Sequence, residues 1–276
     1  MLATAMGAAA IPRVLSIAGS DSGGGAGIQA DLKAFARCGV HGMTAVTAIT
    51  AQNTIGVQAV YSLPPELIID QVRSVSQDIG VDAVKIGMLA NVATIEAVER
   101  ALDLVGAVPV VLDPVMVAES GAVLLDADAR DALVSRLLPR ATVVTPNLPE
   151  ARVLADVAEA PDELAGDDRE ALARAIAALG AAIVVITGGH ASDAVDWYLD
   201  GDDLVPIPGE RHAAGAAHGS GCTHSSALAA QLALGHSPLE AARRAKAIAA
   251  EAVRDGLSDI GAGAGPVDVF GLARRG

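Results

Sequence analysis

The hydrophobic positions of this chain fall into short continuous runs that alternate with longer segments of helical spacing. The short runs are rich in Val, Ile and Leu, which is typical of strands buried on both faces of a sheet. In the longer segments apolar residues recur three and four positions apart, as on one face of a helix. The expected strands are Arg13–Ala18, Met43–Ala51, Ala83–Ile86, Pro109–Leu112, Thr142–Val144 and Ala182–Ile186, followed by a hairpin of Val195–Leu199 and Leu204–Ile207. The expected helices are Ile28–Arg37, Pro65–Ile79, Val92–Val105, Asp126–Leu138, a short helix carrying Glu150, Asp168–Leu179, Ser225–Leu234 and Pro238–Val253.

Strands and helices alternate along nearly the whole chain. This order predicts an α/β fold with a mostly parallel central sheet and helices on both faces. No linker or repeat interrupts the alternation, so residues 13–276 are expected to form one domain after an N-terminal extension of residues 1–12. The extension lacks the basic region of a signal peptide. Residues 161–168 are expected to form an acidic surface loop.

Nearly every expected strand ends in a polar or glycine-rich tip. Open α/β sheets bind their ligands at the carboxyl ends of the strands, so these tips are the predicted site. The tips are Gly19–Gly27, Gln52, Met88, Asp113, Asn147 and Gly189.

Composition and charge narrow the class of ligand. Hydrophobic residues make up 52% of the 276 residues, so the chain can bury a sizeable core. The net charge of −14 argues against a nucleic-acid surface, and no apolar run is long enough to span a membrane. Two cysteines, Cys38 and Cys222, make no disulfide framework, and a cytoplasmic location is expected. An anionic ligand would have to be held by backbone N–H groups, a few cations and a metal ion.

The segment His218–His224 carries the strongest local signal for such a ligand. Two glycines, Gly219 and Gly221, stand just before an Ala/Leu-rich helical run. Backbone N–H groups and the positive end of the helix dipole make this place suitable for a phosphate. Cys222 would lie in the first turn, where a thiol is easier to ionise. The alternative is a glycine turn before a core helix, with a buried, inert cysteine.

A second glycine-rich stretch, Gly19–Gly27, suggests a dinucleotide site, because Gly25–Ala30 fits Gly-x-Gly-x-x-Ala. In such sites an acidic residue ends the second strand, whereas here that strand runs into Gln52 and Asn53. No Gly-Lys-Ser/Thr follows the stretch, which excludes a Walker P-loop.

Several polar residues at the strand tips have two interpretations each. Asn147 and Glu150 could both reach a hydrated Mg²⁺, or they could simply begin a helix. Asp113 could lie beside a metal or phosphate, or form an Asx turn. Gln52 has the donor and acceptors to pair with the edge of an aminopyrimidine, or it could cap a loop. No catalytic role is assigned to His190 or His218, and Cys38 is expected in the core.

Seven segments of the chain, in this order, resemble the hydroxymethylpyrimidine/phosphomethylpyrimidine kinases of thiamine biosynthesis, members of the ribokinase-like superfamily. The resemblance extends from about Val14 to Val253. Its segments are Gly19–Lys33, Thr47–Thr54, Lys85–Leu89, Asp113–Met116, Thr145–Ala151, Gly188–His190 and His218–Thr223.

The resemblance implies a ribokinase-like three-layer sandwich and an ATP- and Mg²⁺-dependent kinase, with a monovalent cation as a further candidate. Its substrates would be 4-amino-5-hydroxymethyl-2-methylpyrimidine and then the monophosphate of that compound. The alternatives are a pyridoxal or pyridoxine kinase and a non-catalytic pyrimidine-binding homologue. We expect a small-molecule ligand and a homodimer, with no nucleic-acid or membrane partner.

The resemblance also implies roles for individual residues. The pyrimidine would be surrounded by Gly19, Ala26, Asp31, Gln52, Met88, Val115 and Cys222. The anion hole for the transferring phosphoryl group would be Gly219, Ser220 and Gly221, with Cys222 as the catalytic thiol. Asn147 and Glu150 would serve the metal, and Asn147, Thr187 and Asp113 the nucleotide. Many relatives carry Lys where this chain has Thr187, so one contact with the ATP phosphates is expected to differ.

Overall fold

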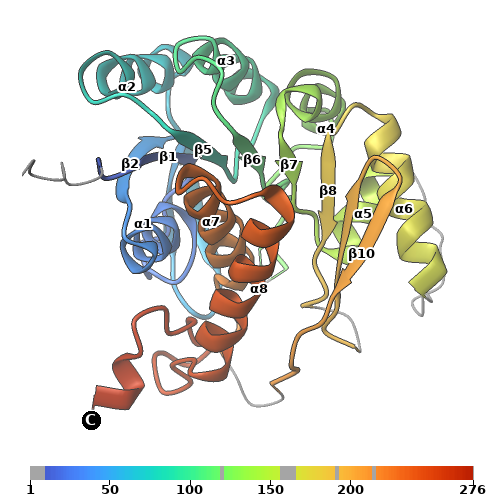
Figure 1. Ribbon diagram of the computed structural model, residues 1–276. Helices are drawn as coiled ribbons and strands as arrows, with labels where there is room; N and C mark the ends of the chain where they lie inside the picture. Colours follow the sequence, from blue (N-terminus) through green and yellow to red (C-terminus); the bar gives the residue numbers. More distant parts are fainter. Residues whose placement is uncertain (1–9, 119–120, 156–165, 190–192, 213–215, 276) are drawn as a thin grey trace, which may run out of the picture.

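The computed structural model describes residues 10–118, 121–155, 166–189, 193–212 and 216–275. A central sheet of eight strands has the order β10-β9-β8-β7-β6-β5-β1-β2 (Figure 1). Strands β1, β2 and β5 to β8 are parallel, whereas β9 and β10 form the antiparallel hairpin at one edge. The bounds are β1 Arg13–Ala18, β2 His41–Val46, β5 Ala83–Ile86, β6 Val110–Leu112, β7 Val143–Val144, β8 Ile183–Ile186, β9 Asp196–Asp200 and β10 Asp203–Ile207. The predicted α/β fold with a mostly parallel sheet is confirmed.

Helices cover both faces of this sheet, as the continuous apolar strands require. One face is covered by α1 (Gly27–Cys38), α7 (Ser220–Ala233) and α8 (Pro238–Arg254). The other is covered by α2 (Pro65–Asp78), α3 (Val92–Leu102), α4 (Ala129–Ala132), α5 (Leu148–Leu154) and α6 (Gly166–Ala178). Alternate strand residues enter the two cores: Leu15 and Ile17 pack on the α2–α3 side, and Val14 on the α1–α7 side.

The stretch expected as one strand, Met43–Ala51, is divided between two sheets. The backbone N–H of Thr47 donates to Ala18 O, and its hydroxyl donates to Met88 O at 2.8 Å. After this residue the chain leaves the main sheet as β3 (Ala48–Gln52), which pairs with β4 (Val57–Ser62) in a separate hairpin. Strand β4 was not predicted because most of its residues are exposed and it shows no alternation of buried and exposed positions.

Further boundaries also differ from the expectation. The helix expected over Asp126–Leu138 is α4 followed by a π-helical turn, η1 (Leu133–Leu137), and a 3-10 turn, η2 (Leu138–Arg140). Pro139 in this last turn lacks the N–H that a continuing α-helix needs. Helix α3 ends at Leu102 rather than Val105, and a short 3-10 turn, η3 (Leu272–Arg275), closes the described chain. Helix α6 already begins at Gly166, so the surface-loop prediction is wrong for residues 166–168, and residues 161–165 lie outside the described part, as do residues 1–9 of the extension.

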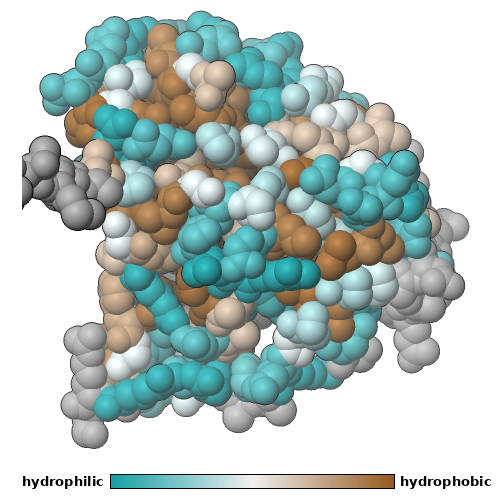
Figure 2. All heavy atoms as spheres, viewed as in Figure 1, coloured by the Kyte–Doolittle hydropathy of each residue, from teal (hydrophilic) through white to brown (hydrophobic). Residues whose placement is uncertain are grey.

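In the described residues, none of the helices combines the length and the apolar character needed to cross a membrane. Figure 2 shows the exposed side chains of α8 as a hydrophilic band between more hydrophobic areas over α2–α3 and the β9–β10 hairpin.

Candidate active site

A cavity of about 410 Å³ lies at the carboxyl ends of the parallel strands. It is lined by residues of the strand tips, of the β3–β4 hairpin and of the first turns of α1, α5 and α7. Every candidate residue of the sequence analysis except Asp31 lines this cavity: Gly19, Ala26, Gln52, Met88, Asp113, Val115, Asn147, Glu150, Thr187, Gly219, Ser220, Gly221 and Cys222. The structure therefore brings these residues together, while their individual roles stay predictions.

The first glycine-rich stretch, Gly19–Gly27, is organised by the carboxylate of Asp21. Its Oδ1 accepts the N–H of Gly23 at 2.8 Å, and its Oδ2 accepts those of Gly25 and Ala26 at 2.9 and 2.8 Å. Burial raises the pKa of Asp21, but the contact with His218 and the backbone donors outweigh it and leave the pKa below its ordinary value. Three N–H groups of the loop donate to its own aspartate and are not available to a ligand. We therefore interpret it as a structural loop rather than a phosphate-binding loop.

His218 joins this first loop to the second one. Its Nε2 lies 3.0 Å from Asp21 Oδ2 and 3.4 Å from Gln52 Nε2. Gly25 and Gly219 are both required at this junction, because a Cβ on Gly25 would overlap the His218 ring and one on Gly219 would overlap the Gly25 carbonyl oxygen. His218 is thus more than the turn residue of the sequence analysis, since it holds the two loops together.

The second glycine-rich segment begins helix α7. Gly219 is the N-cap, with φ of 85°, and the helix starts at Ser220, so Cys222 lies in the first turn as expected. Ser220 N donates to Ala217 O at 2.9 Å, which removes it from the expected set of free donors. The N–H groups of Gly221 and Cys222 have no acceptor within the helix. A Cβ built on Gly221 meets nothing within 4 Å, so the space over this helix start is open to the cavity.

The thiol of Cys222 has a higher pKa than the sequence predicts. Burial raises the pKa of Cys222 to about 12, and the carboxylates of Asp31 and Asp113 add to the effect. Lys85 and a backbone hydrogen bond from Gly27 act in the opposite direction but do not balance it. The expectation that this thiol is easier to ionise is therefore wrong, because burial has the largest effect on its pKa.

A buried network of charges lies beside the thiol. The fully buried Lys85 places its Nζ 3.0 Å from Asp31 Oδ1 and 3.9 Å from Asp113 Oδ2. Ser16 and Ser226 each donate a hydroxyl to the Asp31 carboxylate, at 2.5 and 2.7 Å. Asp31 is fully buried, and its oxygens are bonded to these partners rather than lining the cavity, so its expected place around the pyrimidine stays a prediction.

Lys85 itself does line the cavity, together with Asp113. Burial lowers the pKa of Lys85, but the nearby carboxylates outweigh it and hold the ammonium charged. Asp113 accepts a hydrogen bond from Ser225 at 2.9 Å, and burial raises the pKa of its carboxyl group. In the sequence, Lys85 stands out only within the segment Lys85–Leu89. The signal that could have singled it out is a lone lysine within a continuous apolar strand.

Asn147 and Glu150 form a capping box at the start of α5. Asn147 Oδ1 accepts the Glu150 N–H and Glu150 Oε2 accepts the Asn147 N–H, both at 2.9 Å. The helix-start interpretation is thus confirmed, while the metal role is a prediction that these contacts leave open. Within the described ranges, His, Cys, Asp and Glu side chains form no group of three or more that could hold a metal. The residues fit a Mg²⁺ that keeps most of its waters and phosphate ligands.

The remaining candidates come from other elements of the cavity wall. The Met88 side chain closes on Gly19, where it leaves no room for a Cβ, and Gln52 lies at an irregularity of the β3–β4 hairpin. Thr187 follows β8 and donates its N–H to Pro146 O at 2.9 Å. His190 lies outside the described residues. Polar residues that the sequence analysis did not name also line the cavity: Asp196, Glu210, Arg211, His212, His224 and Lys246.

The three-layer fold, the cavity at the strand ends and the glycine-capped helix beside it define a small-molecule kinase of the ribokinase-like class. Comparison with known proteins identifies the family. The family model for phosphomethylpyrimidine kinase matches residues 21–268. A hydroxymethylpyrimidine/phosphomethylpyrimidine kinase of Rhizobium meliloti (strain 1021) is 50% identical over 93% of this chain and 96% of its own. The chain belongs to the phosphomethylpyrimidine kinase family.

Solved structures of two relatives agree with this fold. The pyridoxal kinase of Staphylococcus aureus in complex with pyridoxal is 36% identical, with a TM-score of 0.85 and 96% of each chain covered. The phosphomethylpyrimidine kinase of Clostridium difficile 630 is 39% identical, with a TM-score of 0.76, covering 88% of this chain and 99% of the other. The Staphylococcus aureus enzyme has also been solved with ADP.

Proposed function

We propose that this chain transfers a phosphoryl group from ATP to 4-amino-5-hydroxymethyl-2-methylpyrimidine and then to the resulting monophosphate, in thiamine biosynthesis. The observation that carries the proposal is the open helix start at Gly221 and Cys222, which faces the same cavity as Gln52 and Met88. It supports the proposal because an anion bound at this helix start would share one cavity with the side chains of Gln52 and Met88.

Phosphoryl transfer asks the protein for positioning and charge stabilisation rather than covalent chemistry. The N–H groups of Gly221 and Cys222 would stabilise the charge that develops on the transferring group. Lys85 would hold positive charge beneath the reacting atoms without being exposed to solvent. These fixed donors explain how a chain with a net charge of −14 could handle ATP.

The metal ion would be Mg²⁺, held mainly by the nucleotide phosphates and water, with Glu150 and Asn147 at its outer shell. Mg²⁺ would neutralise phosphate charge when bound. The chain's own contribution is to place the capping box of α5 at the cavity wall.

The edge of the pyrimidine would pair with the amide of Gln52, which can both donate and accept. A buried amide matched to one ligand rejects another that leaves it unpaired, so discrimination can be strong. Pyridoxal is the second candidate substrate, because the solved pyridoxal kinase shares the fold over 96% of the chain.

The test is a steady-state assay of ADP release with ATP and each acceptor in turn: the pyrimidine alcohol, its monophosphate and pyridoxal. We expect kcat/KM for the pyrimidine to exceed that for pyridoxal, and Gln52→Leu to reduce this preference. Comparable efficiency on pyridoxal would contradict the substrate assignment. Absence of turnover with all three acceptors would favour a non-catalytic pyrimidine-binding homologue.

We also propose that the protein is cytoplasmic and forms a homodimer. Both cysteines are free, as expected in a reducing compartment. The β3–β4 hairpin exposes apolar side chains, among them Ile49, Val60 and Tyr61, which suits a contact between copies. Light scattering on the purified chain would decide between monomer and dimer.

A further inference from the structure

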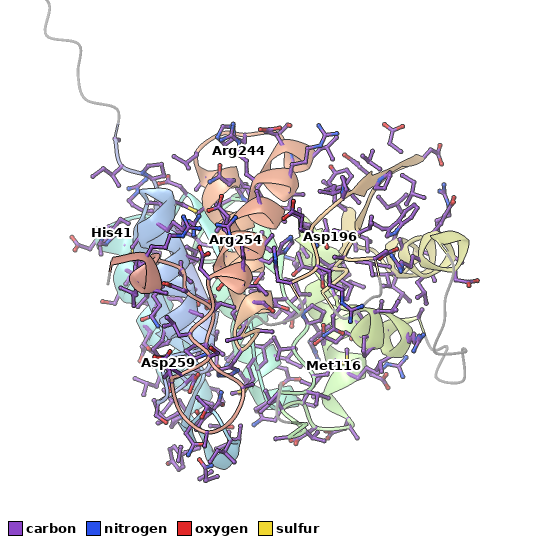
Figure 3. All side chains as sticks on the ribbon, turned by 90° about the horizontal axis from the view of Figure 1, so that it is seen from below. His41, Met116, Asp196, Arg244, Arg254 and Asp259 are labelled. Atoms are coloured by element: carbon purple, nitrogen blue, oxygen red, sulfur yellow. The ribbon has the colours of Figure 1, made fainter. Side chains whose placement is uncertain are left out.

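A second cluster of polar side chains lies at the cavity wall on the side of the β9–β10 hairpin. It consists of Asp196 at the start of β9, His224 in α7 and Lys246 in α8, and all three line the cavity. Asp196 is 1% exposed and His224 is 4% exposed, so both are removed from bulk water. Figure 3 shows Asp196 beside helix α8, on the side that faces the β9–β10 hairpin.

The carboxylate of Asp196 ties three elements together. Its Oδ1 accepts the Gly188 N–H at 2.8 Å and a hydrogen bond from Lys246 Nζ at 2.5 Å, while its Oδ2 lies 3.2 Å from His224 Nε2. Burial raises the pKa of Asp196, but the contacts with His224, Lys246 and Gly188 outweigh it and the carboxylate stays ionised. The buried Asp196 carboxylate therefore contacts three elements: the tip of β8, helix α7 and helix α8.

This cluster is incomplete within the described chain. Neither ring nitrogen of His224 makes a hydrogen bond there, and Asp196 Oδ2 makes none either, although it is within ion-pair distance of the ring. Buried polar groups are normally paired, because an unpaired one loses its hydration without compensation. Lys246, with three donors, has Asp196 as its one anionic partner among the described residues. A cation with spare donors lies at the cavity wall, beside an imidazole whose Nε2 faces Asp196 and whose Nδ1 has no partner, and this indicates a place prepared for an anion.

The geometry points to Lys246 as a binding residue for the phosphates of the nucleotide, with Asp196 and His224 as its positioning residues. The inference rests on the proposed function, since that supplies ATP as the ligand. Lys85 is committed to two buried carboxylates, and Thr187 at the tip of β8 carries no charge. When Lys246 turns from Asp196 to a phosphate, His224 is already beside the carboxylate and keeps it paired.

The test compares the affinities for ADP and for adenosine, measured by calorimetry on the full chain. We expect Lys246→Gln to weaken ADP binding about 10- to 100-fold, the range for a charge-assisted hydrogen bond, and to leave adenosine binding unchanged. Glutamine can still donate to Asp196, so the fold should persist. Lys246→Arg should restore most of the ADP affinity. Arg244→Gln, which removes the same charge from the exposed side of α8, is the matched control and should have no effect.

The positioning role of His224 is tested by a double-mutant cycle. Loss of His224 leaves Asp196 without its second partner, so His224→Leu should weaken ADP binding several-fold in the wild-type background. In the Lys246→Gln background it should add nothing, because the lysine through which it acts is gone. Additive effects would contradict the positioning role.

Unchanged ADP affinity in Lys246→Gln, or an equal loss for ADP and adenosine, would overturn the role of Lys246. These outcomes are independent of the acceptor, so an enzyme that binds ADP as expected but fails to phosphorylate the pyrimidine would overturn the proposed function instead.

Discussion

The two glycine-rich loops of this protein look alike in sequence and differ in what they do with their backbone N–H groups. In the loop Gly19–Gly27 the carboxylate of Asp21 accepts three of them, from Gly23, Gly25 and Ala26. At the start of α7 the N–H groups of Gly221 and Cys222 remain without an acceptor in the helix. Glycine content therefore does not decide which loop binds an anion; the destination of each N–H group does.

The two loops also depend on each other. The second loop packs against the first through His218, which contacts Asp21, and through Gly219, which lies against the Gly25 carbonyl oxygen. We therefore expect the first loop to contribute mainly to stability and the second to contribute to phosphoryl transfer. Substitutions in the first loop should consequently lower stability, whereas substitutions in the second should lower turnover.

The largest effect is expected from a bulky residue at Gly221. The Cβ of Gly221→Val has open space, so folding should be normal, but the side chain would occupy the phosphoryl site over the helix start. We expect kcat to fall about 10³-fold, near the upper end for the loss of an oxyanion-hole donor. Gly25→Val in the first loop is the counterpart, and it should lower stability because its side chain would overlap His218. Steady-state kinetics and thermal melts of both variants distinguish the roles of the loops. Near-normal turnover in Gly221→Val would contradict an anion site at the start of α7.

A smaller effect is expected from Cys222→Ala, about 10²-fold on kcat, at the low end for a general base. Because the pKa of the thiol is raised to about 12, the thiolate is scarce at neutral pH and its fraction grows as pH rises. If the thiolate accepts the substrate proton, kcat of the wild-type enzyme should increase from neutral to alkaline pH, and the variant should lose this increase. Cys38→Ala, the other cysteine, is the control. A rise with pH that persists in Cys222→Ala would assign it to another group.

Asp21→Asn should cost stability rather than catalysis, roughly 2 kcal/mol in the free energy of unfolding, since a buried carboxylate that accepts several N–H groups is replaced by an amide. The pKa of Asp21 is lowered in the folded protein, so its stabilisation is complete above the unfolded pKa and is lost as pH falls through the folded value. The difference between wild type and variant in urea denaturation should therefore shrink below about pH 4. A constant difference across this range would show that the carboxylate charge is unimportant.

The smallest effect is expected at the capping box. Glu150→Ala should raise the Mg²⁺ concentration needed for half-maximal activity by a few-fold and cost about 1 kcal/mol of stability through the lost cap. Glu240→Ala is a matched control, because Glu240 stands in the first turn of α8, where its N–H bonds the Ser237 cap, away from the cavity. If both variants show the same Mg²⁺ dependence as wild type, Glu150 serves only the helix.

Sequence reasoning predicted the fold well where burial decides the pattern. The parallel strands are continuous apolar runs, so their positions and the helices between them followed from periodicity. It failed for β4, whose exposed residues carry no pattern, and for the break at Thr47, which depends on a hydrogen bond to Met88 O. Such a tertiary contact leaves no local signal.

For the candidate site, too, tertiary contacts limit what the sequence can predict. The strand tips could be assigned to one cavity because parallel strands end at one edge of a sheet. The pKa of Cys222 could not be predicted, since it depends first on the burial of the thiol in the folded chain and then on Lys85, Asp31 and Asp113 from three distant segments. Asp196, His224 and Lys246 were missed for the same reason, because only the folded chain places them together.

The central claim is that the start of α7, and not the first glycine loop, receives the transferring phosphoryl group. Backbone amide NMR on the labelled protein tests it directly, by adding ADP with aluminium fluoride as a mimic of the phosphoryl group, in the absence of pyrimidine. We predict large shifts for the amides of Gly221 and Cys222 and small ones for Gly23 and Gly25, which stay bonded to Asp21. Large shifts at Gly23 and Gly25 with none at Gly221 would contradict the account.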